Sequence, residues 1–498
     1  MTAVSWLPIS ILLSSLVPGL LIFFLGEQRH GLRTLLNLAG AITKLILIGI
    51  LIWGVSNEIV YEYRFILAPG MELVLHADAL SVLFVTLSTV LWFVTTLYAI
   101  GYLEHSPHRS RFFGFFSLCV TATVGVAMSG NMLTFVFFYE LLTLATYPLI
   151  VHRGTPEALR GGRIYLTYTL IGGAVLLAGV AWLRALAGPL DFTEAGILGD
   201  KIDLDPAHLS LIFALMIGGL GVKAALVPLH GWLPQAMIAP APVSALLHAV
   251  AVVKAGAFGI IRVVYDVYGI EFAAELDLLL PLLILASFTI IYGSVRALFQ
   301  DELKKRLAYS TVSQVSYIAL GTAMFGPIAS IGGIIHLVNQ GLMKITLFFC
   351  AGNYAETLGI HHISEMRGVG RRMPWTTVAF TLGALGMIGV PPMAGFISKW
   401  YLGSGALASE HYWVIGILIA SGLLNAAYFL PILYKAWFQQ AAGYWPKEHH
   451  FGRFETHWML LLPPVFTAIA ALMAGLLAEA PYSILEWVRL IVYREYSQ

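Results

Sequence analysis

The chain has 498 residues, of which 59% are hydrophobic and 11% are charged, and its formal net charge is +1. A soluble domain carries about 25% charged residues, so the composition excludes a soluble globular protein and predicts an integral membrane protein. The small net charge provides no basic surface for phosphate groups, which excludes nucleic acid as a partner.

Apolar segments long enough to cross a bilayer occur along the whole chain. A hydrocarbon core of about 30 Å needs about 20 apolar residues per helix. No small-residue cleavage site follows the first segment, so we expect it to be a membrane span and not a signal peptide. About fourteen spans are predicted by this rule, near residues 4–25, 31–54, 77–101, 111–128, 130–151, 163–186, 208–229, 241–265, 272–295, 304–325, 328–351, 375–403, 412–438 and 458–478. We therefore predict an all-α membrane protein with a single membrane domain over residues 1–498.

The positive charges of the loops predict an orientation. Cytoplasmic loops of membrane proteins carry an excess of lysine and arginine. If both termini lie on the outer face of the cell inner (cytoplasmic) membrane, the inner loops collect most of these residues. The outer segments then hold only Arg64, Arg184, Lys201, Arg262, Arg489 and Arg494. We predict this multi-pass topology because one span more or fewer would spoil the alternation.

Five lysines remain inside the predicted spans, together with one glutamate and several histidines. A charge at the bilayer centre costs about 2.5–3.5 kcal/mol on insertion scales, so we expect these residues to face one another or water. The fifth lysine, Lys44, is the weakest candidate, because its long stem can snorkel or pack against a neighbouring subunit. The candidate proton-path residues are Glu140, Lys223, His230, His248, Lys254, His336, Lys344 and Lys399.

A structural role explains some of these candidates better than others. His248 and His336 are equally well explained as hydrogen-bonded core histidines, whereas Lys254 lies too deep in its span to snorkel easily. The remaining strong candidates lie well inside a span beside glycine or proline, which favours a functional role. They are Glu140, Lys223 and Lys399.

Lysine and glutamate suit proton transfer inside a membrane. Loss of hydration favours the neutral form of both side chains, and a nearby opposite charge favours the charged form. A Glu140–Lys223 pair would therefore keep Lys223 protonated, and separation of the pair would let Lys223 release a proton. Histidine, which titrates near pH 6.5 in water, can pass the proton onward.

The sequence predicts ion movement and not the making of bonds. It carries no P-loop, dinucleotide fingerprint or HExxH motif, and we expect no catalytic residue, cofactor or metal. The two cysteines, Cys119 and Cys350, cannot build an iron–sulfur cluster, which needs about four thiolates. We expect them to pack as small apolar side chains.

Two proline-rich segments interrupt the predicted helices, one after Lys223 and one before Lys399. The prolines are Pro228, Pro234, Pro391 and Pro392. An interruption at membrane depth is tolerated only where the backbone is buried or lines a water-filled cavity. Corresponding interruptions in the two halves indicate inverted repeats, which we predict at residues 111–265 and 272–438 with five helices each.

Several motifs resemble those of one family. The segment "HGWLPQAMIAPAPVSALLHAVAVVKAGAFGIIR" (residues 230–262) is similar to the signature of the proton-translocating antiporter-like subunits of respiratory complex I, Mrp-type Na+/H+ antiporters and membrane-bound hydrogenases. In the same order the chain carries "HADALSVLF" (76–84), "NMLTFVFFYELLTLATYPLI" (131–150), "LKKRLAYSTVSQVSYI" (303–318) and "GVPPMAGFISKW" (389–400). The resemblance covers nearly the whole chain and implies fourteen helices with two inverted five-helix repeats.

The resemblance also implies roles for individual residues. Glu140 resembles the glutamate of the family's fifth helix, and Lys223 resembles the lysine of its broken seventh helix. Lys254 resembles the eighth-helix lysine, and His336 the eleventh-helix histidine. Lys399 resembles the twelfth-helix residue that hands the proton to the far side. The chain length and "GVPPMAGFISKW" look most like the D-type subunit of Mrp antiporters, although "PVSALLHA" is intact here where that subunit often departs from it.

Three functions are consistent with these features. The leading prediction is a proton-translocating, cation/proton-antiporting subunit of a multisubunit complex. Its predicted partners are other membrane subunits, the lipid bilayer, protons, and Na+ or K+. One alternative is the proton-pumping subunit of a complex I-like quinone reductase or membrane-bound hydrogenase, with the redox centres on other subunits. The other is the energy-coupling subunit of an inorganic-carbon uptake complex.

Overall fold

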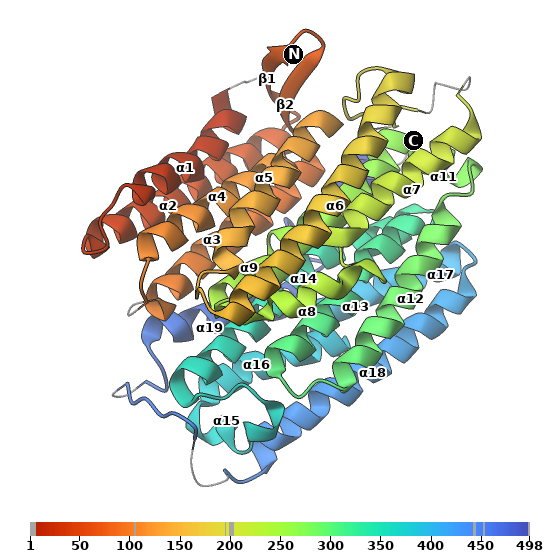
Figure 1. The fold of residues 1–498 in the computed structure, drawn as a ribbon. Helices are drawn as coiled ribbons and strands as arrows, with labels where there is room; N and C mark the ends of the chain where they lie inside the picture. The colour runs from red at the N-terminus through yellow and green to blue at the C-terminus, as the bar shows by residue number, and fades with distance from the viewer. Residues whose placement is uncertain are drawn as a thin grey trace.

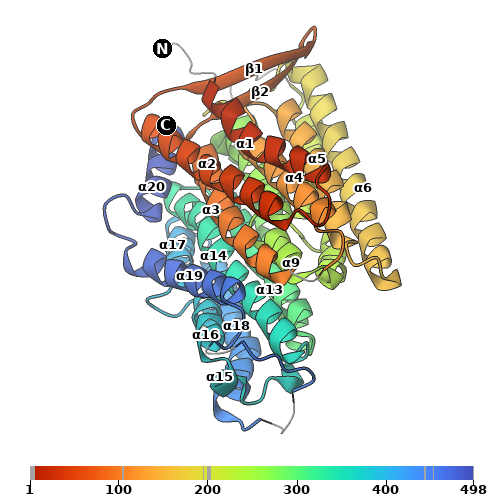
Figure 2. The same ribbon diagram turned by 90° about the vertical axis from the view of Figure 1, so that its left-hand side faces the viewer.

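The computed structural model describes residues 6–103, 106–194, 196–198, 204–441, 445–451 and 454–496. Long helices run between two ends of the molecule (Figure 1). One end carries the antiparallel hairpin of β1 (Tyr61–Ala68) and β2 (Met71–Ala77), and we call it the hairpin end. The other carries the short helix α15 (Val369–Arg372), and we call it the α15 end. Figure 2 shows both ends from the side.

Twelve apolar helical segments in the described residues are long enough to cross a membrane. They are α1 (Trp6–Phe23), α2 (His30–Ser56), α3 (Ala79–Tyr102), α4 (Arg109–Ala127), α5 (Met132–Ile150), α6 (Pro156–Ala187), α7 (Pro206–Lys223), the segment Ala241–Tyr268, α12 (Leu279–Leu298), α14 (Pro327–Leu358), α18 (Tyr412–Phe438) and α19 (Trp458–Leu476). The predicted multi-pass helical membrane protein is thereby confirmed.

Two further predicted spans correspond to one helix that is long enough but not apolar enough and to a pair of helices that are too short. The helix α13 (Leu303–Ala323) carries three consecutive basic residues in its first turn. The segment predicted at 375–403 is two helices, α16 (Pro374–Ile388) and α17 (Ala394–Ala408), so the proline-rich interruption splits this span. The predicted broken helices are confirmed, whereas the two inverted repeats stay a prediction.

Smaller elements complete the chain. The predicted span at 272–295 starts later than expected, because the separate helix α11 (Ile270–Glu275) precedes α12. The hairpin and the last helix, α20 (Ile484–Glu495), are additions to the predicted elements. The remaining short elements are η1 (Leu229–Gly231), α8 (Trp232–Gln235), η2 (Ala236–Ile238), α9 (Ala241–Ala249), α10 (Val252–Arg262), the π-helix η3 (Val263–Tyr268) and η4 (Ile363–Glu365).

Side-chain caps fix where several helices begin. The Asp78 carboxylate accepts from the backbone N–H of Ser81 at 2.7 Å and starts α3. Asn131 accepts from the N–H of Thr134 at 2.8 Å and starts α5. Such caps satisfy backbone donors that the first helical turn leaves unpaired. Short polar residues therefore set the helix boundaries within a largely apolar sequence.

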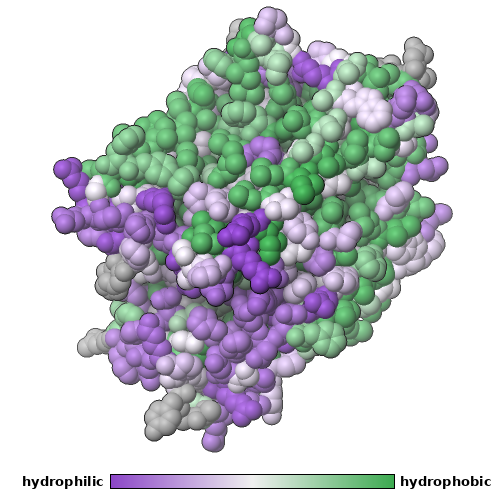
Figure 3. Space-filling view, viewed as in Figure 1, coloured by the Kyte–Doolittle hydropathy of each residue, from purple (hydrophilic) through white to green (hydrophobic). Residues whose placement is uncertain are grey.

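Two helical segments lie at the centre of the bundle. The most apolar windows of Ala241–Tyr268 and of α14 are fully buried, whereas those of α1, α2, α6, α18 and α19 are only 33–39% buried. The outer helices therefore expose large apolar side chains on the surface of the molecule. Figure 3 shows hydrophobic residues over the flank of α1, α6 and α7 and hydrophilic residues around the α15 end. The predicted buried charges of α9, α10 and α14 are therefore enclosed by the chain itself.

The loops predicted to be inside meet at one end of the molecule. The backbone N–H of Arg109 donates to the Glu27 carboxylate at 2.9 Å, which joins the loop before α4 to the loop before α2. The Lys304 amine donates to the Ala239 carbonyl at 2.7 Å, and α13 is tied to the segment before η4. At the hairpin end, the N–H of His76 donates to the Met128 carbonyl at 2.8 Å. The predicted orientation of the termini stays a prediction.

Candidate functional site

Lys223 lies where α7 ends inside the bundle. Its side chain is fully buried, and its amine donates to the backbone carbonyl of Tyr139 on α5. The amine also lies 3.3 Å from the centroid of the Tyr139 ring, a cation–π contact. Pro228 lies in the irregular linker after α7, and Pro234 lies in α8. The interruption thus leaves an amine held by one carbonyl and one aromatic ring.

Glu140 follows Tyr139 on α5, but it does not form an ion pair with Lys223. The structure places no Glu140 oxygen within 4.0 Å of the Lys223 amine. The carboxylate packs instead against Gly173 of α6, where a Cβ atom would overlap it, and its Oε1 atom has no hydrogen-bond partner among the described residues. An influence of Glu140 on Lys223 would therefore operate through the electric field and not through direct contact.

His248 and Lys254 lie on either side of a second break, between α9 and α10. Both are fully buried. The His248 ring stacks on Phe348 of α14 with centroids 4.4 Å apart, and within the part of the chain that the structure describes neither ring nitrogen has a hydrogen-bond partner. The Lys254 amine also has none. His248 is therefore not a hydrogen-bonded core histidine, which was the alternative to a functional role. Buried polar groups without partners cost stability.

The segment of α10 that carries Lys254 packs directly on the break after Lys223. A Cβ atom at Gly256 would overlap the backbone nitrogen of Ala224 and would lie 2.8 Å from the Leu220 carbonyl. Glycine is therefore needed for this close approach. Lys254 lies two residues before Gly256, so the packing brings the two buried lysines onto adjacent helices.

His336 and Lys399 meet around a tyrosine. The Nδ1 atom of His336 on α14 lies 2.9 Å from the Ser398 hydroxyl on α17, the neighbour of Lys399. The ring of Tyr317 on α13 lies 5.1 Å from the His336 ring, and the Lys399 amine lies 5.6 Å from the Tyr317 ring centroid. No sequence pattern singles out Tyr317, because a buried tyrosine is an ordinary core residue.

Lys399 repeats the arrangement of Lys223 in the second half of the chain. Its amine donates to the backbone carbonyls of Met387 at 3.0 Å and Ile388 at 2.7 Å, at the end of α16. Pro391 and Pro392 lie in the irregular segment between α16 and α17. The carbonyl end of a helix carries partial negative charge and favours a cation. Both lysines therefore contact backbone carbonyls and lie near a tyrosine ring, Lys223 on the neighbouring helix α5 and Lys399 at the end of α16 and near Tyr317 of α13.

A chain of hydrogen bonds joins Lys344 to Lys399. The Lys344 amine donates to the Ser310 hydroxyl at 2.6 Å, and that hydroxyl lies 2.8 Å from the Tyr428 hydroxyl. Tyr428 donates to the Asn425 side chain, whose amide nitrogen donates to the Met387 carbonyl at 3.2 Å. Met387 is also the acceptor for Lys399. Sequence reasoning missed the three linking side chains.

Removal of the Tyr428 hydroxyl is expected to slow transport through this chain. Tyr428→Phe keeps the buried ring but breaks both the Ser310 and the Asn425 contact, so we expect proton-coupled transport to fall about ten-fold. Transport by the intact complex in membrane vesicles measures the effect. Tyr434→Phe, on the exposed face of the same helix, is the matched control. An unchanged rate in Tyr428→Phe would show that protons do not use this chain.

His230 lies apart from the other candidates. It belongs to η1 and is 9% exposed, and its ring packs edge-on against Tyr292 of α12 with centroids 5.1 Å apart. In the described part of the chain, no hydrogen bond or ring contact joins it to the other seven residues. The structure therefore encloses Lys223, His248, Lys254, His336 and Lys344 completely, leaves Glu140 and Lys399 partly exposed, and places His230 against Tyr292 and Tyr309 of α12 and α13.

Lys44 neither snorkels nor reaches a neighbouring subunit, so that sequence-based interpretation is wrong. The side chain is fully buried, its amine donates to the Ser15 hydroxyl at 2.6 Å, and it lies 5.0 Å from the Trp92 ring centroid. The Ser15 hydroxyl in turn lies 2.8 Å from that of Thr121. Helices α1, α3 and α4 enclose the amine because their inner faces carry hydroxyls and an indole.

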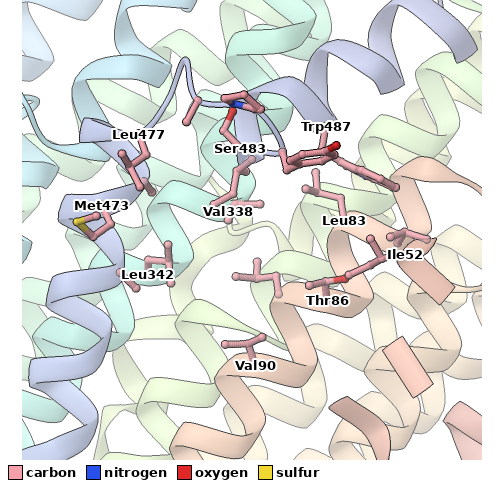
Figure 4. A pocket seen from close by; sticks show the side chains of 18 residues that line it. Ile52, Leu83, Thr86, Val90, Val338, Leu342, Met473, Leu477, Ser483 and Trp487 are labelled. Carbon is pink, nitrogen blue, oxygen red and sulfur yellow. The ribbon is translucent and has the colours of Figure 1, made fainter. Parts of the chain in front are cut away.

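A large pocket of the molecule lies away from these charges. It has a volume of about 520 Å³ and lies between α3, α14, α19 and the start of α20 (Figure 4). Its lining is mostly aliphatic, with Thr86, Ser483 and Trp487 among the few polar side chains. No carboxylate, amine or imidazole that could bind a transferable proton lines this pocket. The candidate site is therefore the string of buried charges and not this pocket.

Comparisons with known proteins show extensive similarity. A sequence profile described as "NADH:quinone oxidoreductase/Mrp antiporter, TM" matches residues 129–424, and one described as "NADH-Ubiquinone oxidoreductase (complex I), chain 5 N-terminus" matches residues 70–113. The N-type subunit of NADH-quinone oxidoreductase from Desulforudis audaxviator is 33% identical over 424 residues, which cover 82% of this chain and 83% of that protein. The D-type subunit of the Na(+)/H(+) antiporter from Bacillus subtilis is 26% identical over 480 residues, which cover 95% and 94%.

Two solved structures share the fold over almost the whole chain. A chain of the Mrp complex from Dietzia sp. superposes with a TM-score of 0.85 at 22% identity, covering 99% of this chain and 97% of that one. A chain of the membrane-bound sulfane sulfur reductase, an archaeal respiratory membrane complex, has a TM-score of 0.84 at 23% identity, covering 97% and 95%. Both of these structural neighbours belong to multisubunit membrane complexes.

Proposed function

The chain belongs to the NADH:quinone oxidoreductase/Mrp antiporter family, and we therefore propose that it carries protons across the membrane as one subunit of a larger complex. The proposed path consists of Glu140, Lys223, His248, Lys254, His336, Lys344 and Lys399, with His230 beside Tyr292 and Tyr309. The other membrane subunits are proposed partners, and the proposed location is the cell inner membrane with both termini on the outer face.

One observation carries the proposal: a lysine lies beside each of two helix breaks, with Lys223 fully buried at the end of α7 and Lys399 partly buried in α17. Lys223 contacts the Tyr139 carbonyl and ring, and Lys399 contacts two carbonyls at the end of α16 near the Tyr317 ring. Neither amine has a carboxylate within ion-pair distance in the described chain. Carbonyl oxygens and aromatic faces stabilise a protonated amine only partially, so each lysine can lose its proton when the local field changes.

Glu140 supplies such a field at the first lysine. A negative carboxylate near Lys223 favours the protonated amine. When Glu140 gains a proton or turns away, Lys223 can pass its proton toward Lys254 and the histidines. Lys344 then receives it and can pass it to the hydroxyls of Ser310 and Tyr428. These hydroxyls lead toward Asn425 and the Met387 carbonyl that Lys399 contacts. Each of these steps is a proton transfer, and no other covalent bond is made or broken.

We propose cation/proton antiport as the coupled reaction, with Na+ or K+ as the second ion. The support is the D-type Na(+)/H(+) antiporter subunit of Bacillus subtilis, which matches nearly the full length of the chain. The alternative is a redox-driven proton pump of the quinone reductase or hydrogenase type. It is favoured by the 33% identity to the N-type subunit of NADH-quinone oxidoreductase.

Transport by the intact complex tests the proposal. Each of Lys223→Ala, Glu140→Ala and Lys399→Ala is expected to lower proton-coupled transport about 100-fold, the usual cost of removing a proton-transfer group. The assay uses inverted membrane vesicles with a pH-sensitive dye, and assembly is checked on native gels. Lys305→Ala, a surface lysine paired with Glu302, is the control. Unchanged transport in all three variants with the complex assembled would refute the proton path.

A further inference from the structure

A cluster of charges at the hairpin end lies outside the path described above. The Arg262 guanidinium at the end of α10 contacts two carboxylates through the same nitrogen, at 2.7 Å from Asp78 and 3.0 Å from Asp266. Arg262 also donates to the Ser81 hydroxyl at 2.9 Å. The Tyr496 hydroxyl after α20 donates to Asp266 at 3.3 Å. Three distant parts of the chain, around Asp78, Arg262 and Tyr496, therefore meet in this cluster.

The exposed fraction of the side chains increases from one side of the cluster to the other. The side chains of Arg262 and Asp266 are 1% and 5% exposed, whereas that of Asp78 is 20% exposed. Behind Asp78, His76 of β2 lies 3.6 Å from Glu62 of β1, and their side chains are 33% and 26% exposed. Carboxylate and imidazole groups therefore continue from the buried Asp266 to the surface of the hairpin.

Two links join this cluster to the helices of the buried path. Lys254 lies eight residues before Arg262 on α10, about 12 Å along the helix axis at 1.5 Å per residue. The Tyr265 hydroxyl, one residue before Asp266, lies within hydrogen-bond distance of the Ser330 hydroxyl on α14. Ser330 lies six residues before His336, about 9 Å along α14. The Tyr265 ring also stacks on Tyr496, with centroids 4.4 Å apart.

The local backbone distinguishes this end of α10 from an ordinary helix terminus. Residues Val263–Tyr268 form a π-helix. Asp266 lies in the same turn as Tyr265, and its carboxylate accepts a hydrogen bond from Arg262. Short π-helical turns occur frequently at functional sites, because they reposition side chains at the cost of regular hydrogen bonds. The cluster also holds two carboxylates for one guanidinium. Two like charges close together favour binding of a proton to one of them.

We propose that Asp266 exchanges protons between the buried path and the solution at the hairpin end, with Arg262 and Asp78 as positioning residues. This inference rests on the proposed function. The Asp266 carboxylate binds a proton that arrives along α10 and α14, and the resulting carboxylic acid gives it up on the side of Asp78. Arg262 keeps the carboxylates together and, with Tyr496, orients Asp266. The reverse order of steps serves proton uptake.

The groups that face Asp266 determine its response to pH. Arg262 on α10 opposes protonation, and Asp78 before α3 favours it. Tyr265 on η3 and Tyr496 after α20 are neutral donors at physiological pH. His76 of the hairpin lies on the side of Asp78, 3.6 Å from Glu62. Proton exchange at Asp266 is therefore expected to depend on the pH of the solution at the hairpin end only.

The pH profile of transport tests the proposal. Asp266→Asn in the intact complex, assayed in vesicles of each orientation, is expected to lower transport about ten-fold and to flatten its dependence on pH at the hairpin side between about pH 5 and 8. Tyr496→Phe, a milder change, is expected to shift that profile with a smaller loss of rate. Glu271→Gln on α11, an exposed acid at the same end, is the control and should leave the profile unchanged.

The outcomes separate this proposal from the proposed function. If Asp266→Asn keeps the wild-type pH profile, or loses only assembled complex with its profile intact, Asp266 is a structural residue and the proposal is wrong. Lys223→Ala is measured in the same vesicles. An inactive Lys223→Ala together with an unaltered Asp266→Asn rejects only the exchange site. Normal transport in Lys223→Ala, Glu140→Ala and Lys399→Ala would reject the proposed function itself.

Discussion

Gly173→Ala is expected to reduce proton-coupled transport about ten-fold, because small misplacements of a functional group have large kinetic effects. A Cβ atom at this position on α6 would overlap the Glu140 carboxylate, and Glu140 is the only residue among its nearest neighbours. The end of a flexible glutamate side chain can move away at little cost. We therefore expect a folded, assembled complex in which Glu140 is displaced from its position near Lys223.

The matched control for Gly173→Ala is Gly218→Ala on the adjacent helix α7. A Cβ atom there meets no other atom within 4 Å, so transport and assembly should both stay at the wild-type level. Transport in membrane vesicles and the amount of complex on native gels are measured for both variants. If Gly173→Ala transports at the wild-type rate, the position of the Glu140 carboxylate does not matter for the path. The effect of Glu140→Ala should then be attributed to its loss of charge alone.

Arg262→Met is expected to destabilise the protein by about 3–5 kcal/mol, the typical cost of removing one partner of a buried ion pair. The substitution keeps much of the length of the side chain and its packing against Phe258, whose ring lies 5.1 Å from the guanidinium. It leaves Asp78 and Asp266 without their shared cation in a mostly buried site. The thermal unfolding midpoint of the detergent-solubilised protein measures the loss.

Neutralising the two acids should recover part of that stability. A variant with Arg262→Met, Asp78→Asn and Asp266→Asn removes all three charges of the cluster, and uncharged replacements of buried ion networks are often neutral or stabilising. We expect its unfolding midpoint to lie between those of Arg262→Met and the wild type. A midpoint of Arg262→Met equal to that of the wild type would mean that water reaches the cluster freely and that the ion pairs contribute little.

The buried path was predictable in its charges but not in its connections. Lys223, Lys254, Lys344 and Lys399 attract attention in the sequence, because a lysine inside an apolar span costs too much to be accidental. Ser310 and Tyr428 do not, because hydroxyl residues are common in transmembrane helices and cost little there. Their role depends on α13 and α18 meeting beside Lys344, and nothing local to either segment specifies that meeting.

The same distinction explains the errors and omissions. The span that carries Lys44 offers it no polar neighbour, which favours snorkelling, yet α1, α3 and α4 enclose it with Ser15, Trp92 and Thr121. By loop position Arg262 is an outer charge, whereas Asp78 and Asp266 bury it at the end of α10. In each case, a partner from a distant segment determines whether a charge faces water.

Local composition specifies the membrane class, the approximate spans, the two broken helices and the set of buried charges. A bilayer requires about 20 apolar residues per span, and proline removes a backbone donor wherever it occurs, so these features are readable without knowledge of any partner helix. Long-range packing, in contrast, separates Glu140 from Lys223, joins Lys344 to Lys399 through hydroxyls, and gathers two acids around Arg262. Helical periodicity defines the faces of each helix, but close contacts at glycines such as Gly173 and Gly256 determine which faces meet.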